Sequence, residues 1–195
     1  MKVLILGHSY VRDLERLGNR EITVNNILVH LSYLSFPGFR FVDFLQNPKL
    51  LDKAISLFPD IILVILGGND IRTDVDLSVV KDNCRDFFAL LCSKFSGSFI
   101  IASQIEFRHL KKVNRHSSPA EDLFRKLANS FNNWLNKQKF KDKILIVNGV
   151  GKLSDASLFK ADGVHLNIHG LEILFELIVS ALSGPVDTLN IKDGK

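Results

Sequence analysis

Short runs of apolar residues alternate along the chain with longer segments in which apolar residues recur every three or four positions. A short apolar run between turn residues is typical of a buried strand, and the wider spacing is typical of an amphipathic helix. The pattern predicts strands at residues 3–6, 27–34, 61–66, 99–102 and 144–147.

Strands that alternate with helices favour a parallel sheet covered by helices on both faces. We therefore expect an α/β fold, a three-layer α/β/α sandwich with a flavodoxin-like five-stranded parallel sheet in the order 2-1-3-4-5. Residues 1–184 form one domain in this prediction. Asn167 caps the last helix and Gly184-Pro185 ends it, so that residues 185–195 form a loose tail.

Composition places the chain among ordinary globular proteins, with 46% hydrophobic and 24% charged residues. The net charge of +4 is weak evidence for an anionic partner. Cys84 and Cys92 lie about 12 Å apart along a predicted helix, too far for a disulfide. Two unpaired cysteines, with no signal peptide and no transmembrane segment in the sequence, predict an intracellular protein, most simply a cytoplasmic one.

The segments that follow the strands contain the candidate chemistry, because ligands of such sheets bind beyond the carboxyl ends of the strands. Parallel topology brings these segments to one edge of the sheet. They read Gly7-His8-Ser9, Phe36-Pro37-Gly38-Phe39, Gly67-Gly68-Asn69-Asp70 and, just before the last helix, Asp162-Gly163-Val164-His165-Leu166-Asn167.

These four segments, in this order, resemble the four blocks of the SGNH (GDSL-type) hydrolase superfamily. The serine, glycine, asparagine and histidine of its name match Ser9, Gly38, Asn69 and His165, and the resemblance covers about residues 3–182. It implies the SGNH hydrolase fold and a serine esterase or deacetylase acting on short acyl esters.

Each matched residue has a chemical task. A serine hydroxyl needs a base before it can act as a nucleophile, and the imidazole of His165 exchanges a proton near neutral pH. Asp162, three positions earlier, can orient that imidazole. The resemblance implies an oxyanion hole formed by the N–H groups of Ser9 and Gly38 and the side-chain amide of Asn69. This chemistry needs no cofactor, and no zinc-like ligand cluster occurs in the sequence.

Simpler interpretations compete with these roles. Ser9 could be an ordinary helix N-cap, and Asn69 a turn former. His169 is a rival base without an acid at a matching offset, and Asp70 is better suited to bonding loop backbone than to catalysis. The chain also departs from the usual Gly-Asp-Ser of the superfamily, because His8 stands in place of the aspartate.

A basic segment, residues 106–116, follows the fourth predicted strand and should overhang the same edge of the sheet. It could be a solvated loop, or a lid that attracts anionic substrates, lipid headgroups or RNA phosphates. Its candidate anion-binding residues are Arg108, Lys111, Lys112 and Arg115.

Two functions from different classes follow. The first is hydrolysis of a small acyl ester, which retention of all four blocks favours. The second is an RNA- or lipid-binding module, since some domains of this fold have lost catalysis. In general character the chain also resembles the esterase module in the first open reading frame of some LINE-type retrotransposons, which would place it within a larger protein.

Overall fold

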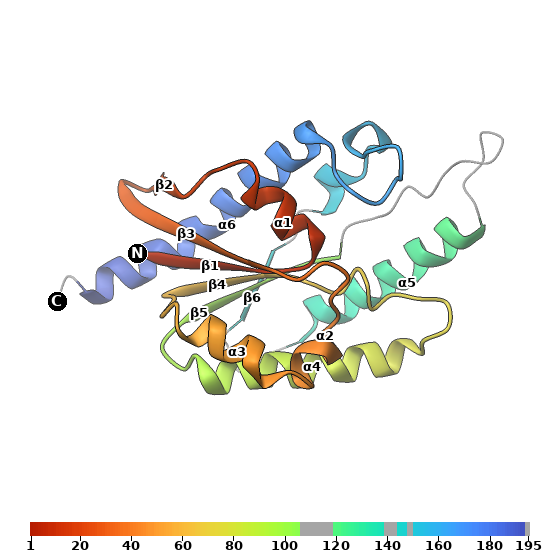
Figure 1. The fold of residues 1–195 in the computed structure, drawn as a ribbon, viewed down its shortest axis with the longest axis horizontal. Coiled ribbons are helices and arrows are strands. Elements are labelled where there is room, and N and C mark those ends of the chain that lie inside the picture. The colour runs from red at the N-terminus through yellow and green to blue at the C-terminus, as the bar shows by residue number, and fades with distance from the viewer. Residues whose placement is uncertain (106–118, 139–143, 148–149, 194–195) are drawn as a thin grey trace.

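The sheet of the computed structural model has six strands in the order β2-β3-β1-β4-β5-β6 (Figure 1). The structure describes residues 1–105, 119–138, 144–147 and 150–193. The strands are β1 (Lys2–Gly7), β2 (Glu21–Val24), β3 (Ile27–Ser35), β4 (Ile61–Ile65), β5 (Phe99–Ser103) and β6 (Ile144–Val147).

The five predicted strands are present, parallel and in the predicted order, with β3, β1, β4, β5 and β6 as neighbours. The sixth strand, β2, was not predicted and pairs with β3 in antiparallel fashion. Asn25 and Asn26 join the two strands with φ angles of 50° and 64°, a left-handed conformation that asparagine tolerates in tight hairpins. Because only Val24 of the four β2 residues is buried, this edge strand has no distinct apolar pattern.

The parallel strands are buried on both faces, and successive residues point to opposite layers. Val3 and Ile5 of β1 pack with α1 (Ser9–Glu15) and α6 (Ile168–Asp193), whereas Leu4 and Leu6 enter the core on the other side. Figure 1 shows the two helix layers. The second layer contains α2 (Phe41–Leu45), α3 (Pro48–Ile55), α4 (Leu77–Lys94) and α5 (Pro119–Asn136), and two short 3₁₀ helices, η1 (Val150–Leu153) and η2 (Ala156–Leu158), precede α6.

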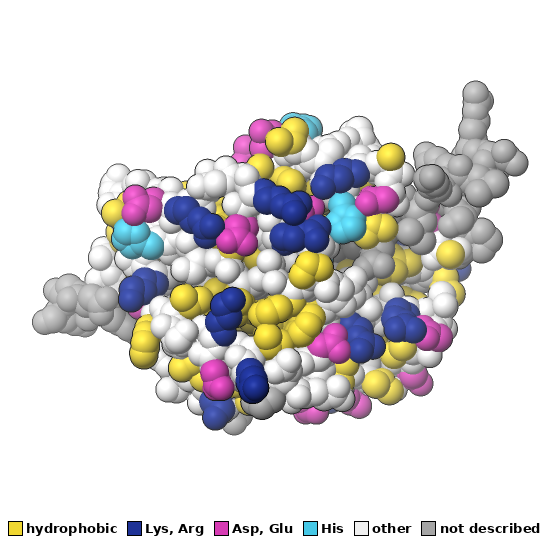
Figure 2. Space-filling view, viewed as in Figure 1, with side chains coloured by type: hydrophobic (Ala, Val, Ile, Leu, Met, Phe, Trp, Pro, Cys, Tyr) yellow, Lys and Arg dark blue, Asp and Glu magenta, His cyan; other side chains and the backbone are white. Residues whose placement is uncertain are grey.

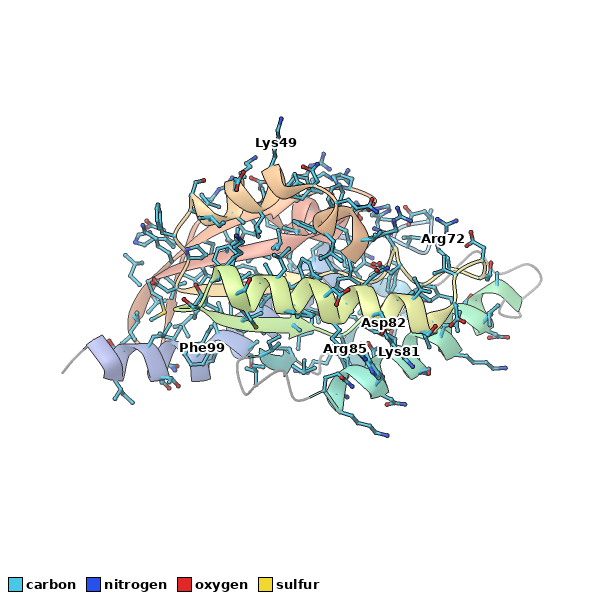
Figure 3. All side chains as sticks on the ribbon, turned by 90° about the horizontal axis from the view of Figure 1, so that it is seen from below. Lys49, Arg72, Lys81, Asp82, Arg85 and Phe99 are labelled. Carbon is cyan, nitrogen blue, oxygen red and sulfur yellow. The ribbon has the colours of Figure 1, made fainter. Side chains whose placement is uncertain are left out.

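Aromatic residues fill the layer formed by α2 to α5. Phe41 of α2 lies 5.5 Å from Phe87 of α4 and 6.2 Å from Phe131 of α5, measured between ring centroids. Arg85 of α4 reaches across to α5, where its guanidinium lies 5.7 Å from the centroid of Trp134 (Figure 3). These contacts fix α2, and with it the loop that precedes α2, against the sheet.

The predicted end of the last helix is wrong. Gly184-Pro185 does not end α6, which continues to Asp193. Val186 is fully buried beyond the proline, and the Asn25 side chain donates to the Ser183 carbonyl and to Asp187. Burial and these contacts outweigh the local cost of a proline, so residues 185–193 are part of the folded domain and not a loose tail.

By length and composition alone, α6 is also apolar enough to cross a membrane between Ile168 and Ile191. The sequence pattern did not predict such a segment. The stripe formed by Leu171, Leu174, Ile178 and Leu182 is buried against the sheet. This packing accounts for the apolar character of that side of the helix.

Replacing Val186 with alanine tests the role of the segment after Pro185. We expect Val186→Ala to lower the free energy of unfolding by about 2 kcal/mol, because it removes buried methyl groups and leaves a cavity. Ile191→Ala is the matched control, since Ile191 is 66% exposed and its loss should cost under about 0.5 kcal/mol. Urea unfolding measures both, and a loss of under about 0.5 kcal/mol for Val186→Ala would contradict its role in the core.

Candidate functional site

The first part of the site is the turn from β1 into α1. Gly7 ends β1 where a side chain would overlap the carbonyl oxygen of Ile65, so only glycine fits at this point. The N–H of His8 then donates to the same Ile65 carbonyl at 3.2 Å, and the Gly7 carbonyl accepts from the Phe36 N–H at 2.9 Å. These bonds fix the turn, and Ser9 begins α1 directly after it.

His8, not Ser9, is the N-cap of α1, with its Nδ1 accepting from the Tyr10 N–H at 3.4 Å. The N-cap interpretation of Ser9 is therefore wrong. The His8 side chain is buried, with 5% of the residue exposed. The hydroxyl of Ser9 remains available for contacts outside the helix.

The second part is the turn before α6. One carboxylate oxygen of Asp162 accepts from the N–H groups of Val164 and His165, at 2.8 and 2.9 Å. The other lies 2.7 Å from Nδ1 of His165. Asp162 thus fixes both the backbone of the turn and the direction of the imidazole ring.

Hydrogen bonding keeps Asp162 ionised. Burial alone would raise the pKa of this carboxyl, but bonds from the N–H and ring of His165 and from the Val164 N–H outweigh it and lower the pKa to about 2. A carboxylate facing Nδ1 favours the tautomer whose proton is on Nδ1. Nε2 of His165 is then an acceptor, and it lies 3.1 Å from Oγ of Ser9.

Two loops complete the site on the opposite side. Asn69 donates from Nδ2 to the Phe39 carbonyl at 3.2 Å, and Asp70 accepts from the Phe41 N–H at 3.1 Å. The loop after β4 therefore fixes the loop between β3 and α2. Gly38 lies in that loop with φ of +80°, a conformation that other residues rarely adopt. This geometry agrees with the structural role expected of Asp70.

All four predicted blocks meet at one cavity of about 350 Å³. The cavity opens beyond the carboxyl ends of the strands, as expected for this topology. Its lining contains Ser9, Gly38, Asn69 and His165. The remaining lining residues are His8, Tyr10, Arg12, Pro37, Gly68 and Val164.

Other predicted residues do not enter the site. His169 is 69% exposed and lies 3.5 Å from Glu172, outside the cavity lining. Residues 106–116 lie outside the described residues, and with them Arg108, Lys111, Lys112 and Arg115. Among the described residues, no three His, Cys, Asp or Glu side chains come together as a metal site.

The sequence interpretation did not predict the contacts by which Tyr10, Asp13 and Lys160 hold the two halves of the site together. Tyr10 donates its hydroxyl proton to the Val164 carbonyl at 2.5 Å. Asp13 of α1 lies 3.3 Å from Nζ of Lys160, which directly precedes the turn with Asp162. The spacing of Ser9 and Asp13 is a signal that could have identified Asp13, because residues four apart share one face of a helix.

Neither a protein-family model nor a curated protein sequence matches the chain. Solved structures do match. An acetyl xylan esterase has a TM-score of 0.67 and 16% identity, over 93% of this chain and 100% of the other. A GDSL-like lipase from Bacteroides thetaiotaomicron VPI-5482 has a TM-score of 0.64 and 17% identity, over 93% of this chain and 87% of the other.

A lipase/acylhydrolase from Enterococcus faecalis is similar over 94% of this chain and 96% of the other, with a TM-score of 0.60 and 18% identity. At these identities the likeness concerns the fold. The chain therefore has the α/β/α fold of SGNH hydrolases, with the extra strand β2 at one edge of the sheet.

The buried Asp70 predicts a dependence of stability on pH. Burial raises its pKa to about 7, against the opposing hydrogen bond from the Phe41 N–H. Between about pH 4 and pH 7 the folded chain keeps a proton that the unfolded chain has released, so the free energy of unfolding falls as pH rises through this window. We expect Asp70→Asn to abolish this fall, which amounts to roughly 2 to 4 kcal/mol.

Urea unfolding at four pH values between 4.5 and 7.5 measures this effect. The stability of Asp70→Asn relative to wild type should rise with pH and level off above pH 7. Asp86→Asn is the control, because Asp86 is exposed on α4 and should leave the pH profile of wild type unchanged. A difference between wild type and Asp70→Asn that stays constant with pH would contradict the assignment.

Proposed function

We propose that the chain is a serine esterase or deacetylase that hydrolyses short acyl esters. The observation that carries this proposal is the continuous contact from Ser9 Oγ through His165 to Asp162 at a cavity that Gly38 and Asn69 also line. Structures of a GDSL-like lipase, a lipase/acylhydrolase and an acetyl xylan esterase share the fold and support the general class of reaction.

In the proposed reaction, Oγ of Ser9 attacks the ester carbonyl while Nε2 of His165 takes the hydroxyl proton. The imidazolium that forms is stabilised by the Asp162 carboxylate. When the tetrahedral intermediate collapses, the alcohol leaves with the proton from Nε2. A water molecule then attacks the acyl-serine, again with His165 as base, and releases the acid and the free hydroxyl of Ser9.

The negative oxygen of the intermediate needs hydrogen-bond donors. We assign these to the N–H groups of Ser9 and Gly38 and to the amide of Asn69. Nδ2 of Asn69 donates to the Phe39 carbonyl at 3.2 Å. That contact would hold the amide in place beside the cavity.

A binding module for RNA or anionic lipid, within a larger retrotransposon-type protein, is the alternative function. Its argument depends on the basic residues of the segment 106–116, of which the structure describes none. The assembled Ser9, His165 and Asp162 contacts favour hydrolysis, since a module that only binds has no need of them.

Substitution of the site residues tests hydrolysis directly. On p-nitrophenyl acetate we expect Ser9→Ala to lower kcat by roughly 10⁶-fold, or to background, because the nucleophile is lost. Asn69→Ala should lower kcat by about 10²–10³-fold, because other oxyanion donors remain. A series of longer p-nitrophenyl esters, measured on wild type, then defines the acyl length that the cavity accepts.

Matched controls separate catalysis from folding. Ser180→Ala and Asn190→Ala change exposed residues of α6 and should keep wild-type rates. Circular dichroism and thermal unfolding establish that each variant is folded. Wild-type turnover by folded Ser9→Ala would overturn the proposal.

Asp162→Asn tests the orientation of the imidazole. The amide can no longer stabilise the imidazolium or select the Nδ1–H tautomer, so we expect kcat to fall by about 10²–10⁴-fold. The rate of the variant should be compared with that of Asp86→Asn, which removes an exposed carboxylate remote from the cavity. Equal rates for both variants would exclude Asp162 from the reaction.

A further inference from the structure

A row of charged residues extends from the nucleophile along one face of α1. Ser9, Arg12, Asp13 and Arg16 are spaced three and four apart, so their side chains project from the same side of the helix. Arg12 lines the cavity beside Ser9, and about 5–6 Å separates the Cβ atoms of residues at this spacing. A substrate bound at Ser9 is therefore within one helical turn of a guanidinium.

The charges of this row do not cancel. The Asp13 carboxylate, 3% exposed, lies 3.2 Å from Nε of Arg12, 3.3 Å from Nη1 of Arg16 and 3.3 Å from Nζ of Lys160. One carboxylate thus faces three cations, so this cluster of four side chains has a net charge of +2. Figure 2 shows Lys and Arg side chains gathered beside a histidine on the face that contains α1.

The cations remain accessible to a ligand. The side chains of Arg12, Arg16 and Lys160 are 36%, 69% and 48% exposed. Arg12 donates to Asp13 from Nε at 3.2 Å, and its guanidinium has two further NH₂ groups that can donate. Asp13 therefore orients the guanidinium, and the terminal groups can donate to a second anion.

The carboxylate nearest to the cavity, that of Asp162, is bonded to Nδ1 of His165 and lies behind the lining. No Asp or Glu occurs among its lining residues in the part of the chain that the structure describes, and Arg12 is the one permanently charged residue there. The lining on the opposite side consists of Pro37, Gly38, Gly68 and Asn69, all of them uncharged. The positive charge therefore lies on one side of the cavity, on the helix α1 that begins with Ser9.

We infer that this site selects acyl esters that bear an anionic group, a phosphate or a carboxylate, about one helical turn from the scissile carbonyl. The inference rests on hydrolysis at Ser9, and Arg12 is the residue that contacts the anion. Arg16 and Lys160 add to the positive field at the edge of the cavity. The relevant substrates are acidic esters, in contrast to neutral acetylated alcohols.

Pairs of esters with and without a negative charge test this inference, and the rate of each ester without enzyme is subtracted. One pair is 4-acetoxybenzoate and its neutral methyl ester, and 4-acetoxyphenyl phosphate tests phosphate in place of carboxylate. A second pair, 4-nitrophenyl hydrogen glutarate and 4-nitrophenyl methyl glutarate, places the charge on the acyl side. Each kcat/KM is divided by the hydroxide-catalysed rate of the same ester, which removes differences in intrinsic reactivity.

We expect wild type to prefer the anionic member of at least one pair by about 10-fold, and Arg12→Gln to bring the ratio of the anionic to the neutral rate close to one. Arg16→Gln should give a smaller loss, since Arg16 does not line the cavity. Raising the salt from 0.05 to 1 M should weaken the preference of wild type. The control is Arg20→Gln, because Arg20 pairs with Glu15 outside the cavity.

The possible results separate the two proposals. Hydrolysis that depends on Ser9 without any charge preference would overturn this inference and leave the esterase proposal intact. Phosphate preferred over carboxylate, or the reverse, identifies the anion. If no ester is turned over, the anion site is tested by binding instead. Calorimetry compares the affinity for phenyl phosphate of Ser9→Ala with that of the double variant Ser9→Ala, Arg12→Gln. Equal affinity in the two would overturn the inference, and weakening by about 10-fold would support it.

Discussion

The site depends on one contact between distant parts of the chain, the 3.1 Å approach of His165 Nε2 to Ser9 Oγ across 156 positions of sequence. Neither residue is unusual by itself. The approach is possible because β1 ends at the edge of the sheet beside β3 and β4, and because α6 returns over the same face as α1.

Several bonds stabilise this contact from the two sides. The Tyr10 hydroxyl and the Asp13 carboxylate, both on α1, contact Val164 and Lys160 on either side of the turn with Asp162. Burial would raise the pKa of Asp13, but hydrogen bonds from Lys160 and Arg12 outweigh it and lower the pKa. A buried carboxylate thus connects the nucleophile's helix to the histidine turn, and it also orients the cations at the cavity edge.

The loops on the opposite side of the cavity are also fixed by contacts between distant segments of the chain. Asn69 donates to the Phe39 carbonyl in the loop that contains Gly38, and the adjacent Asp70 accepts from the Phe41 N–H at the end of that loop. Phe41 begins α2 just after that loop, and its ring packs against Phe87 and Phe131 in the core. The position of Gly38 is therefore fixed by hydrophobic packing on one side and by polar contacts on the other.

The sequence by itself determined the parallel core and the four segments at its edge. Strands buried on both faces read as continuous apolar runs, and short polar segments such as Gly67-Gly68-Asn69-Asp70 stand out between them. Tertiary structure decided what local pattern does not encode. Strand β2 forms because its backbone can pair with the outer edge of β3. Helix α6 continues past Pro185 because Val186 is buried in the core. The cation cluster around Asp13 likewise needs Lys160, which only folding brings to α1.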